Sequence, residues 1–120
     1  MLLGLLGISG CADTGDRPEL GEVEGVVTLD SKPLAGALVT FKPDLGKPSF
    51  AKTDENGNYR IAYLRDISGA KVGTHRIKIT TATEENPEET VPSRYNDESE
   101  LVREVSPGNN QLDFHLESGT

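Results

Sequence analysis

The stretch VEGVVTLDSKPLAGALVTFKP, residues 23–43, decides the fold, because it contains two strand patterns separated by a turn. Every second residue of its first segment shares one face, with Gly25 at a place where close packing is needed: Val23, Gly25, Val27 and Leu29. Asp30 and Ser31 then suit the tight positions of the turn. In the second segment, 37–43, the alternation returns: Ala37, Val39 and Phe41 face one way.

The same alternation continues beyond residue 43 in short segments with turn signals between them. These segments are FAKTDENGNYRIAYL (50–64), THRIKITT (74–81), LVREV (101–105) and QLDFHL (111–116). The faces expected to point inward carry Tyr59, Ile61 and Tyr63; His75, Ile77, Ile79 and Thr81; Leu101 and Val105; and Leu112, Phe114 and Leu116. Asn56-Gly57 predicts a hairpin within 50–64, since Asn-Gly supplies the positive φ values of a tight turn. About seven short strands predict an all-β domain, a single β-sandwich.

Composition and charge exclude several classes of partner. Of 120 residues, 34% are hydrophobic and 5% aromatic, so the core is thin and mostly aliphatic. Twelve basic residues against 20 acidic ones give a net charge of −8, which opposes nucleic-acid binding and electrostatic docking onto anionic lipid. The single cysteine rules out an intramolecular disulfide.

That cysteine follows a short apolar run, MLLGLLGISG, too short for a transmembrane helix. Ile8-Ser9-Gly10-Cys11 resembles a bacterial lipobox, in which a branched aliphatic residue and two small residues precede a cysteine. The resemblance implies that the Cys11 thiol receives a diacylglyceryl group, that the signal is removed before it, and that the new amino terminus is acylated with a chain such as palmitate. Acyl chains then hold the protein at the membrane.

The expected organisation is a signal peptide at 1–10, a lipidated Cys11 with a flexible tether at 11–21, a domain at 22–117 and a tail at 118–120. No basic residue precedes Cys11, so we expect that translation begins upstream and that this signal is truncated. Ala12, rather than Asp, favours the outer membrane over the inner one. The domain is then expected in the periplasm or at the cell surface.

Four blocks resemble carboxypeptidase regulatory-like domains, also described as transthyretin-like or prealbumin-like: residues 23–43, KTDENGNYRI (52–61), VGTHRIKIT (72–80) and 91–116. The last block resembles the version found in small bacterial lipoproteins. The resemblance implies a seven-stranded Greek-key sandwich and says almost nothing about activity, because the fold hosts unrelated roles.

Two loops carry the candidate ligand-binding residues. Asp54, Asn56 and Asn58 crowd oxygen atoms around a glycine turn, which is a weak candidate for calcium, although Arg65 stands where an EF-hand would place its distal Glu. The acidic stretch 84–100 is the other candidate, as a contact or cation surface, with Tyr95, Asn96 and Asp97 inside it. Both also have a plain structural reading, as a turn and as a solvated loop.

We expect no enzyme, no metal cofactor and no catalytic group. His75 and His115 lie on different strands without zinc-ligand spacing, and the C-terminal Tyr-Arg-Gly-Ser of the transthyretin-like hydrolases is replaced by His-Leu-Glu-Ser-Gly-Thr. The leading hypothesis is a membrane-anchored lipoprotein serving as a structural, adhesive or protein-binding module of the cell envelope, with other envelope proteins as partners. The alternative is a module whose loops bind carbohydrate or calcium.

Overall fold

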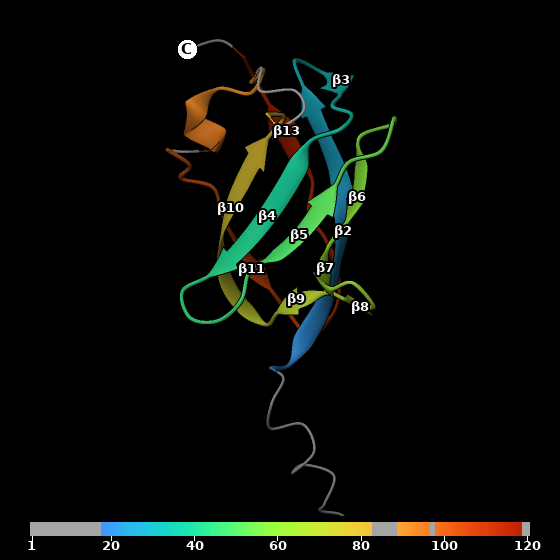
Figure 1. Ribbon diagram of the computed structural model, residues 1–120, viewed down its shortest axis with the longest axis vertical. Coiled ribbons are helices and arrows are strands. Elements are labelled where there is room, and N and C mark those ends of the chain that lie inside the picture. Colours follow the sequence, from blue (N-terminus) through green and yellow to red (C-terminus); the bar gives the residue numbers. More distant parts are fainter. Residues whose placement is uncertain (1–17, 83–88, 97, 119–120) are drawn as a thin grey trace, which may run out of the picture.

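The computed structural model describes residues 18–82, 89–96 and 98–118. Within those ranges it contains twelve strands, β2 to β13, and one short 3-10 segment, η2 (Ser93–Tyr95), but no α-helix. The strands form two sheets, which lie one in front of the other in Figure 1. The prediction of an all-β domain is therefore confirmed, and the two layers are consistent with a β-sandwich. No helix in the described ranges is long and apolar enough to cross a membrane.

The front sheet has six strands and is antiparallel throughout. In spatial order its strands are β11 (Val102–Val105), β10 (Gly73–Thr80), β4 (Leu38–Pro43), β5 (Ser49–Lys52), β7 (Ala62–Leu64) and β8 (Ile67–Ser68). Its long central strands, β10 and β4, pair from His75 opposite Pro43 to Thr80 opposite Leu38. This register fixes which side chains share the outer surface.

The rear sheet is organised around one long strand, β2 (Leu20–Leu29). Three short strands pair antiparallel with β2: β9 (Ala70–Lys71), β6 (Asn58–Arg60) and β3 (Lys32–Pro33). Two strands from the C-terminal part of the chain pair parallel with it: β12 (Gly108–Gln111) and β13 (Phe114–Leu116). In Figure 1, β2 and β13 pass behind β4 and β5.

The core between the sheets consists of the alternate residues expected to point inward. Most of them are buried: Val23, Val27, Ala37, Val39, Phe41, Tyr59, Ile61, His75, Ile77, Ile79, Val105, Phe114 and Leu116. Leu29, Tyr63, Thr81, Leu101 and Leu112 are only partly buried. Phe41 and Phe114 meet edge to face with their ring centroids 6.3 Å apart, which joins the two sheets.

Gly25 permits a close approach between β2 and the chain that enters β13. A Cβ atom at this position would lie 1.9 Å from the carbonyl oxygen of Leu112, well inside van der Waals contact. The sequence prediction that Gly25 stands where close packing is needed is thus confirmed.

The hairpin predicted at Asn56-Gly57 is wrong in one respect. The tight turn forms, with Gly57 at φ +80° and its N–H donating to the Asp54 carbonyl at 3.0 Å. However, β5 before the turn belongs to the front sheet, whereas β6 after it pairs with β2. The Gly57 carbonyl accepts the Val27 N–H at 2.8 Å, so the turn is held against the rear sheet and carries the chain from one layer to the other.

The expected count of about seven strands also differs from the twelve observed in the described residues. Several of the additional strands are two-residue bridges, namely β3, β8 and β9. The stretch 58–71 is divided between the sheets, because β6 and β9 pair with β2 while β7 and β8 join the front sheet.

Several predictions fall on residues outside the described ranges. The signal at 1–10, the lipobox residues Ile8, Ser9 and Gly10, the lipidated Cys11, most of the tether at 11–21, and Asp97 all lie there. They stay predictions.

Candidate functional site

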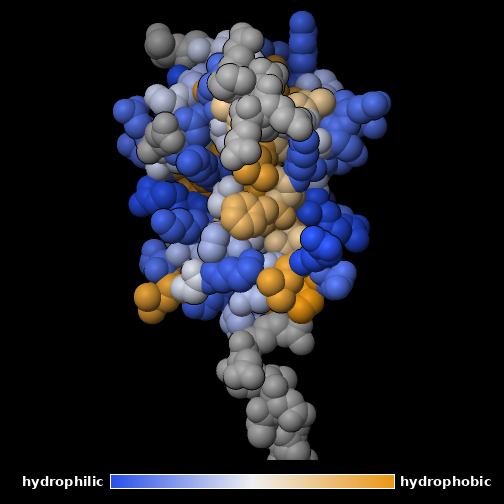
Figure 2. All heavy atoms as spheres, in the orientation of Figure 1, coloured by the Kyte–Doolittle hydropathy of each residue, from blue (hydrophilic) through white to orange (hydrophobic). Residues whose placement is uncertain are grey.

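The outer surface of the front sheet combines basic and apolar side chains in a chain whose net charge is −8. Four exposed cations project from its strands, and we call them the cationic face: Lys42, Lys52, Arg76 and Lys78. Figure 2 views this side, and it shows apolar atoms down the middle with hydrophilic residues on both sides.

Two of these cations stand directly opposite each other. Arg76 on β10 is the register partner of Lys42 on β4, and Lys78 follows two residues along β10, opposite Thr40. Directly opposed side chains of a sheet have Cβ atoms about 4.5–5.5 Å apart, so a like-charge pair is destabilising. Acids contact this surface near both ends of β10: Glu104, on the neighbouring strand β11 opposite Thr74, accepts the Thr74 hydroxyl at 2.7 Å, and Glu89 accepts the Thr80 hydroxyl.

Apolar side chains lie among the cations. Phe50 is 43% exposed and is the register partner of Thr40, so it lies on the same surface as Lys78. Leu38 and Val102 are 37% and 48% exposed on the same outer surface. At the margin, Lys47 holds its Nζ 5.9 Å from the Phe50 ring centroid and 4.7 Å from that of Tyr63.

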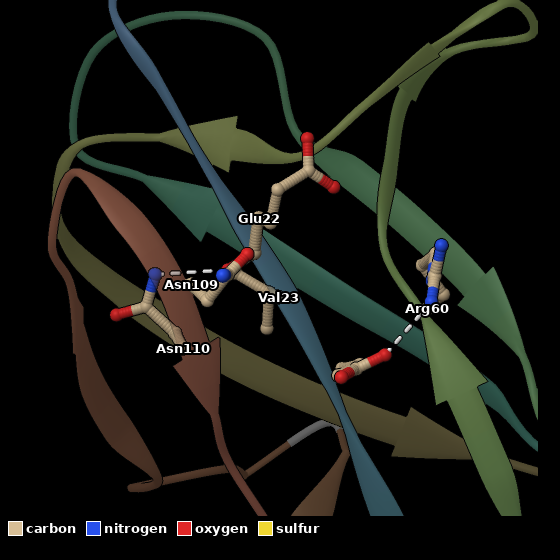
Figure 3. A pocket seen from close by; sticks show the side chains of 6 residues that line it. Glu22, Val23, Arg60, Asn109 and Asn110 are labelled. Atoms are coloured by element: carbon tan, nitrogen blue, oxygen red, sulfur yellow. Dashed lines mark hydrogen bonds and ion pairs between the residues drawn. The ribbon is translucent and has the colours of Figure 1, made fainter.

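The outer surface of the rear sheet is hollowed, but its polar groups bind one another. Its depression of about 230 Å³ is lined by Glu22, Val23, Glu24, Arg60, Asn109 and Asn110 (Figure 3). Arg60 Nη2 lies 2.9 Å from Glu24 Oε1, and Asn110 Nδ2 donates to the Glu22 carbonyl at 2.9 Å. The Glu22 carboxylate accepts the Ser68 hydroxyl at 2.9 Å. These contacts tie strands together and leave few polar groups for a ligand.

The candidate cation site at Asp54 serves mainly to shape its turn. Asp54 Oδ1 accepts the backbone N–H groups of Asn56 and Asn58 at 2.8 and 2.9 Å. These are the hydrogen bonds of an Asx-type turn, in which a side chain replaces a backbone acceptor. In the described part of the chain no three His, Cys, Asp or Glu side chains gather where a metal ion would sit.

The described part of the acidic stretch is fastened to the front sheet. Asn96 is buried, and its Nδ2 donates to the Val91 and Pro92 carbonyls at 3.2 Å each. The Ser99 hydroxyl donates to the Ile77 carbonyl, and the Tyr95 hydroxyl accepts the Glu117 N–H at 3.2 Å. In Figure 1 this segment and the turn between β5 and β6 lie on opposite sides of the molecule, so the two candidate loops do not form one site.

Glu89 closes the same segment onto the end of β10. Its carboxylate accepts the Thr80 hydroxyl, the Thr81 N–H at 2.8 Å and the Val91 N–H at 3.1 Å. Partial burial acts to raise the pKa of Glu89, but these hydrogen bonds outweigh it and lower the pKa to about 2. Glu89 therefore holds the chain near Val91 against the end of β10.

The two histidines occupy different layers. His75 is 1% exposed in the core, where Nε2 lies 2.6 Å from the Lys71 carbonyl oxygen and the ring packs 5.6 Å from Phe41. His115 is exposed on β13 of the rear sheet, with Nδ1 3.0 Å from the Thr28 hydroxyl. The two rings therefore do not converge on one site.

The cationic face was not predicted from the sequence. A sequence signal for it exists, because Lys42, Lys52, Arg76 and Lys78 all occupy polar positions of alternating strands. The pattern indicates a shared surface only when β4, β5 and β10 are known to be neighbours. The strand pairing in the structure shows that they are.

No family model matches the chain, and no curated protein matches it. The fold and its surfaces define a small two-sheet β domain with a basic, partly apolar face on one side.

Proposed function

We propose that this protein is a non-enzymatic lipoprotein of the bacterial cell envelope and that its domain binds another protein. The domain is taken as a prealbumin-like Greek-key sandwich, similar to carboxypeptidase regulatory-like domains. A lipid on Cys11 anchors it, with the outer membrane favoured by Ala12 and the domain in the periplasm or at the surface. The all-β architecture in two sheets supports the sandwich part of this assignment.

The observation that carries the binding role is the outer surface of the front sheet. Exposed Phe50 and Arg76 are of the residue types enriched in protein interfaces, and exposed Leu38 and Val102 add apolar surface beside them. By contrast, the polar groups around the rear depression are used within the domain. The front sheet is thus the binding surface in this proposal.

The anchor is tested by metabolic labelling with an alkyne-bearing palmitate, followed by mass spectrometry of the membrane-extracted protein. We expect label on Cys11, and we expect Cys11→Ser to lose both the label and the membrane association. An unmodified Cys11 in the membrane fraction would contradict the anchored part of the proposal.

The binding surface is tested in intact cells with a photo-crosslinking amino acid at position 50 on the front sheet. The matched control carries it at position 26 on the rear sheet, where Val26 is partly exposed. We expect position 50 to capture a protein and position 26 to capture little. Capture from position 26 alone would move the binding surface to the rear sheet.

The alternative is a module that binds carbohydrate or calcium, and the exposed Phe50 ring favours its carbohydrate part, because sugars stack on exposed aromatic platforms. Calorimetry with calcium and with a panel of neutral glycans tests it. Heat of binding at millimolar ligand that Phe50→Ser removes would favour this alternative over protein binding.

A further inference from the structure

The chemistry of a partner for the cationic face follows from what would neutralise the positive charge of that face. Lys42 and Arg76 stand opposite each other, and Lys78 is two residues from Arg76 on the same strand. Along a strand, side chains that share a face are separated by about 6.6–6.8 Å. An extended acidic segment with carboxylates at alternate residues has the same repeat, so its side chains can follow the outward-facing residues of β10.

The positive charge of this face is only partly satisfied within the protein. Neither Lys42 nor Lys52 has a hydrogen bond or ion pair among the contacts of the described residues. Arg76 donates from Nη1 to the Ser99 carbonyl at 2.8 Å, which leaves most of the five guanidinium donors for another acceptor. A neutral carbonyl satisfies hydrogen bonding but does not neutralise charge. An anion on this face would therefore gain attraction and relieve repulsion at once.

The apolar residues decide between kinds of anion. Leu38 and Val102 are aliphatic and exposed beside the cations, and they gain most when covered by apolar side chains. Sugars stack mainly on aromatic rings, so a uronic-acid polymer would cover Phe50 but would match the aliphatic positions poorly. A polypeptide supplies carboxylates and apolar side chains together.

A second copy of this chain is disfavoured as the occupant. The acids on the outer surface of its rear sheet are already used: Glu24 pairs with Arg60, and Glu22 accepts from Ser68. Asp113 accepts the Val26 N–H at 3.0 Å. Stacking one copy on another would have to compete with these contacts.

We propose that the cationic face of the front sheet binds an extended acidic segment of another protein, with carboxylates pairing to Lys42, Lys52 and Arg76 and apolar side chains covering Phe50, Leu38 and Val102. This inference rests on the proposed protein-binding function and names the partner by its chemistry.

The test uses the full chain and a synthetic peptide of about 12 residues in which Glu alternates with Thr and Leu, so that the acids keep the strand repeat. A matched peptide carries Gln in place of each Glu. By fluorescence anisotropy, we expect binding of the acidic peptide only. Because exposed charges are screened, a rise from about 50 to 500 mM NaCl should weaken binding about tenfold or more.

Matched variants test whether binding of the acidic peptide depends on the cationic face or on the total charge of the protein. Lys42→Gln combined with Lys52→Gln should weaken binding about tenfold, at the upper end for two exposed ion pairs. Lys32→Gln combined with Arg60→Gln removes the same charge from the rear sheet and should change binding less than about twofold. Equal losses in both double variants would overturn the proposal, as would absence of binding to the acidic peptide.

Binding of another kind of ligand to the cationic face would also overturn the proposal of an acidic segment. Binding of polygalacturonate or of phosphatidylglycerol vesicles, but not of the acidic peptide, overturns it, as does self-association in sedimentation experiments that Lys42→Gln combined with Lys52→Gln removes. Capture of a neutral or basic protein from position 50 in cells would overturn this inference while leaving the proposed protein-binding function intact. Absence of any capture would instead count against the proposed function itself.

Discussion

The two outer surfaces of the domain use charge in opposite ways. On the rear sheet Glu24 pairs with Arg60 on the neighbouring strand β6, and Glu22 accepts the hydroxyl of Ser68, which lies on β8 of the front sheet. On the front sheet Lys42 faces Arg76, a residue of the same sign. The polar groups of the rear surface therefore hold parts of the domain together, whereas the front surface places two like charges opposite each other.

The inner construction of the sheets differs as well. The rear sheet depends on backbone approaching backbone at Gly25, which leaves no room for a Cβ atom. The front sheet is built from long antiparallel strands whose side chains alternate between core and solvent. We expect rear-sheet substitutions to act on stability and front-surface substitutions to act on binding.

The largest effect is expected from Gly25→Val. Its Cβ would overlap the Leu112 carbonyl, so β13 must move away from β2 and stability should fall by about 3 kcal/mol or more. Urea unfolding followed by circular dichroism measures it. Thr40→Val, on the front sheet, is the control and should change stability by less than about 0.5 kcal/mol. Similar losses for both would remove the distinction between the sheets.

Tyr59→Phe should produce the next largest effect. The Tyr59 hydroxyl donates to the Leu112 carbonyl at 2.6 Å, so its loss leaves a partly buried acceptor and costs about 1–2 kcal/mol. Burial, together with the nearby charge of Asp113, raises the pKa of Tyr59 above its usual 10.0. The native protein should therefore lose stability as the pH rises above about 10, because the unfolded chain ionises first.

The control for Tyr59→Phe is Tyr63→Phe. Tyr63 lies on β7 of the front sheet, and Lys47 Nζ is 4.7 Å from the centroid of its ring. We expect a change in stability of less than about 0.5 kcal/mol. An alkaline stability profile that Tyr59→Phe leaves unaltered would show that another group causes it.

Glu89→Gln tests how much the hydrogen-bonded carboxylate at the end of β10 contributes to stability. The pKa of Glu89 is lowered from 4.5 to about 2, so its contribution to stability is present above pH 4.5 and is lost as the pH falls toward 2. The variant should be less stable at neutral pH and should lose less stability on acidification. Glu100→Gln is the control, and thermal unfolding between pH 2 and 7 measures both.

The smallest change in stability is expected from Lys42→Glu, and this change is an increase. Replacing Lys42 gives Arg76 an oppositely charged neighbour, so stability should rise by about 0.2–1 kcal/mol. Binding of the acidic peptide should fall at the same time. Lys52→Glu, whose register partner is Leu38, should weaken binding without the gain in stability. A loss of stability in Lys42→Glu would show that the like-charge pair carries no repulsion.

The sequence predicts the layers of this fold better than it predicts their connections. Alternation identified the buried faces of β2, β4 and β10, because a period of two depends on local residues alone. It could not show that β6 leaves β5 and joins β2. That choice depends on the long-range hydrogen bond from Val27 to Gly57.

The same limit applies to the candidate site. Sequence reasoning chose Asp54 because its turn is rich in oxygen atoms, and Asn96 because it lies in a long acidic loop, but both side chains hold backbone in place. The pairing of Lys42 with Arg76 joins residues far apart in the chain. Only register can reveal such a surface.

The central place of β2 also has a consequence for the order in which the domain is made. Its partners come from every later part of the chain, and the bond from Val26 to Asp113 spans 87 positions. While β12 and β13 are still being synthesised, one side of β2 has no neighbour, and closing such distant contacts is slow. We expect the nascent chain to stay open until residues 108–116 emerge and then to fold in a single late step.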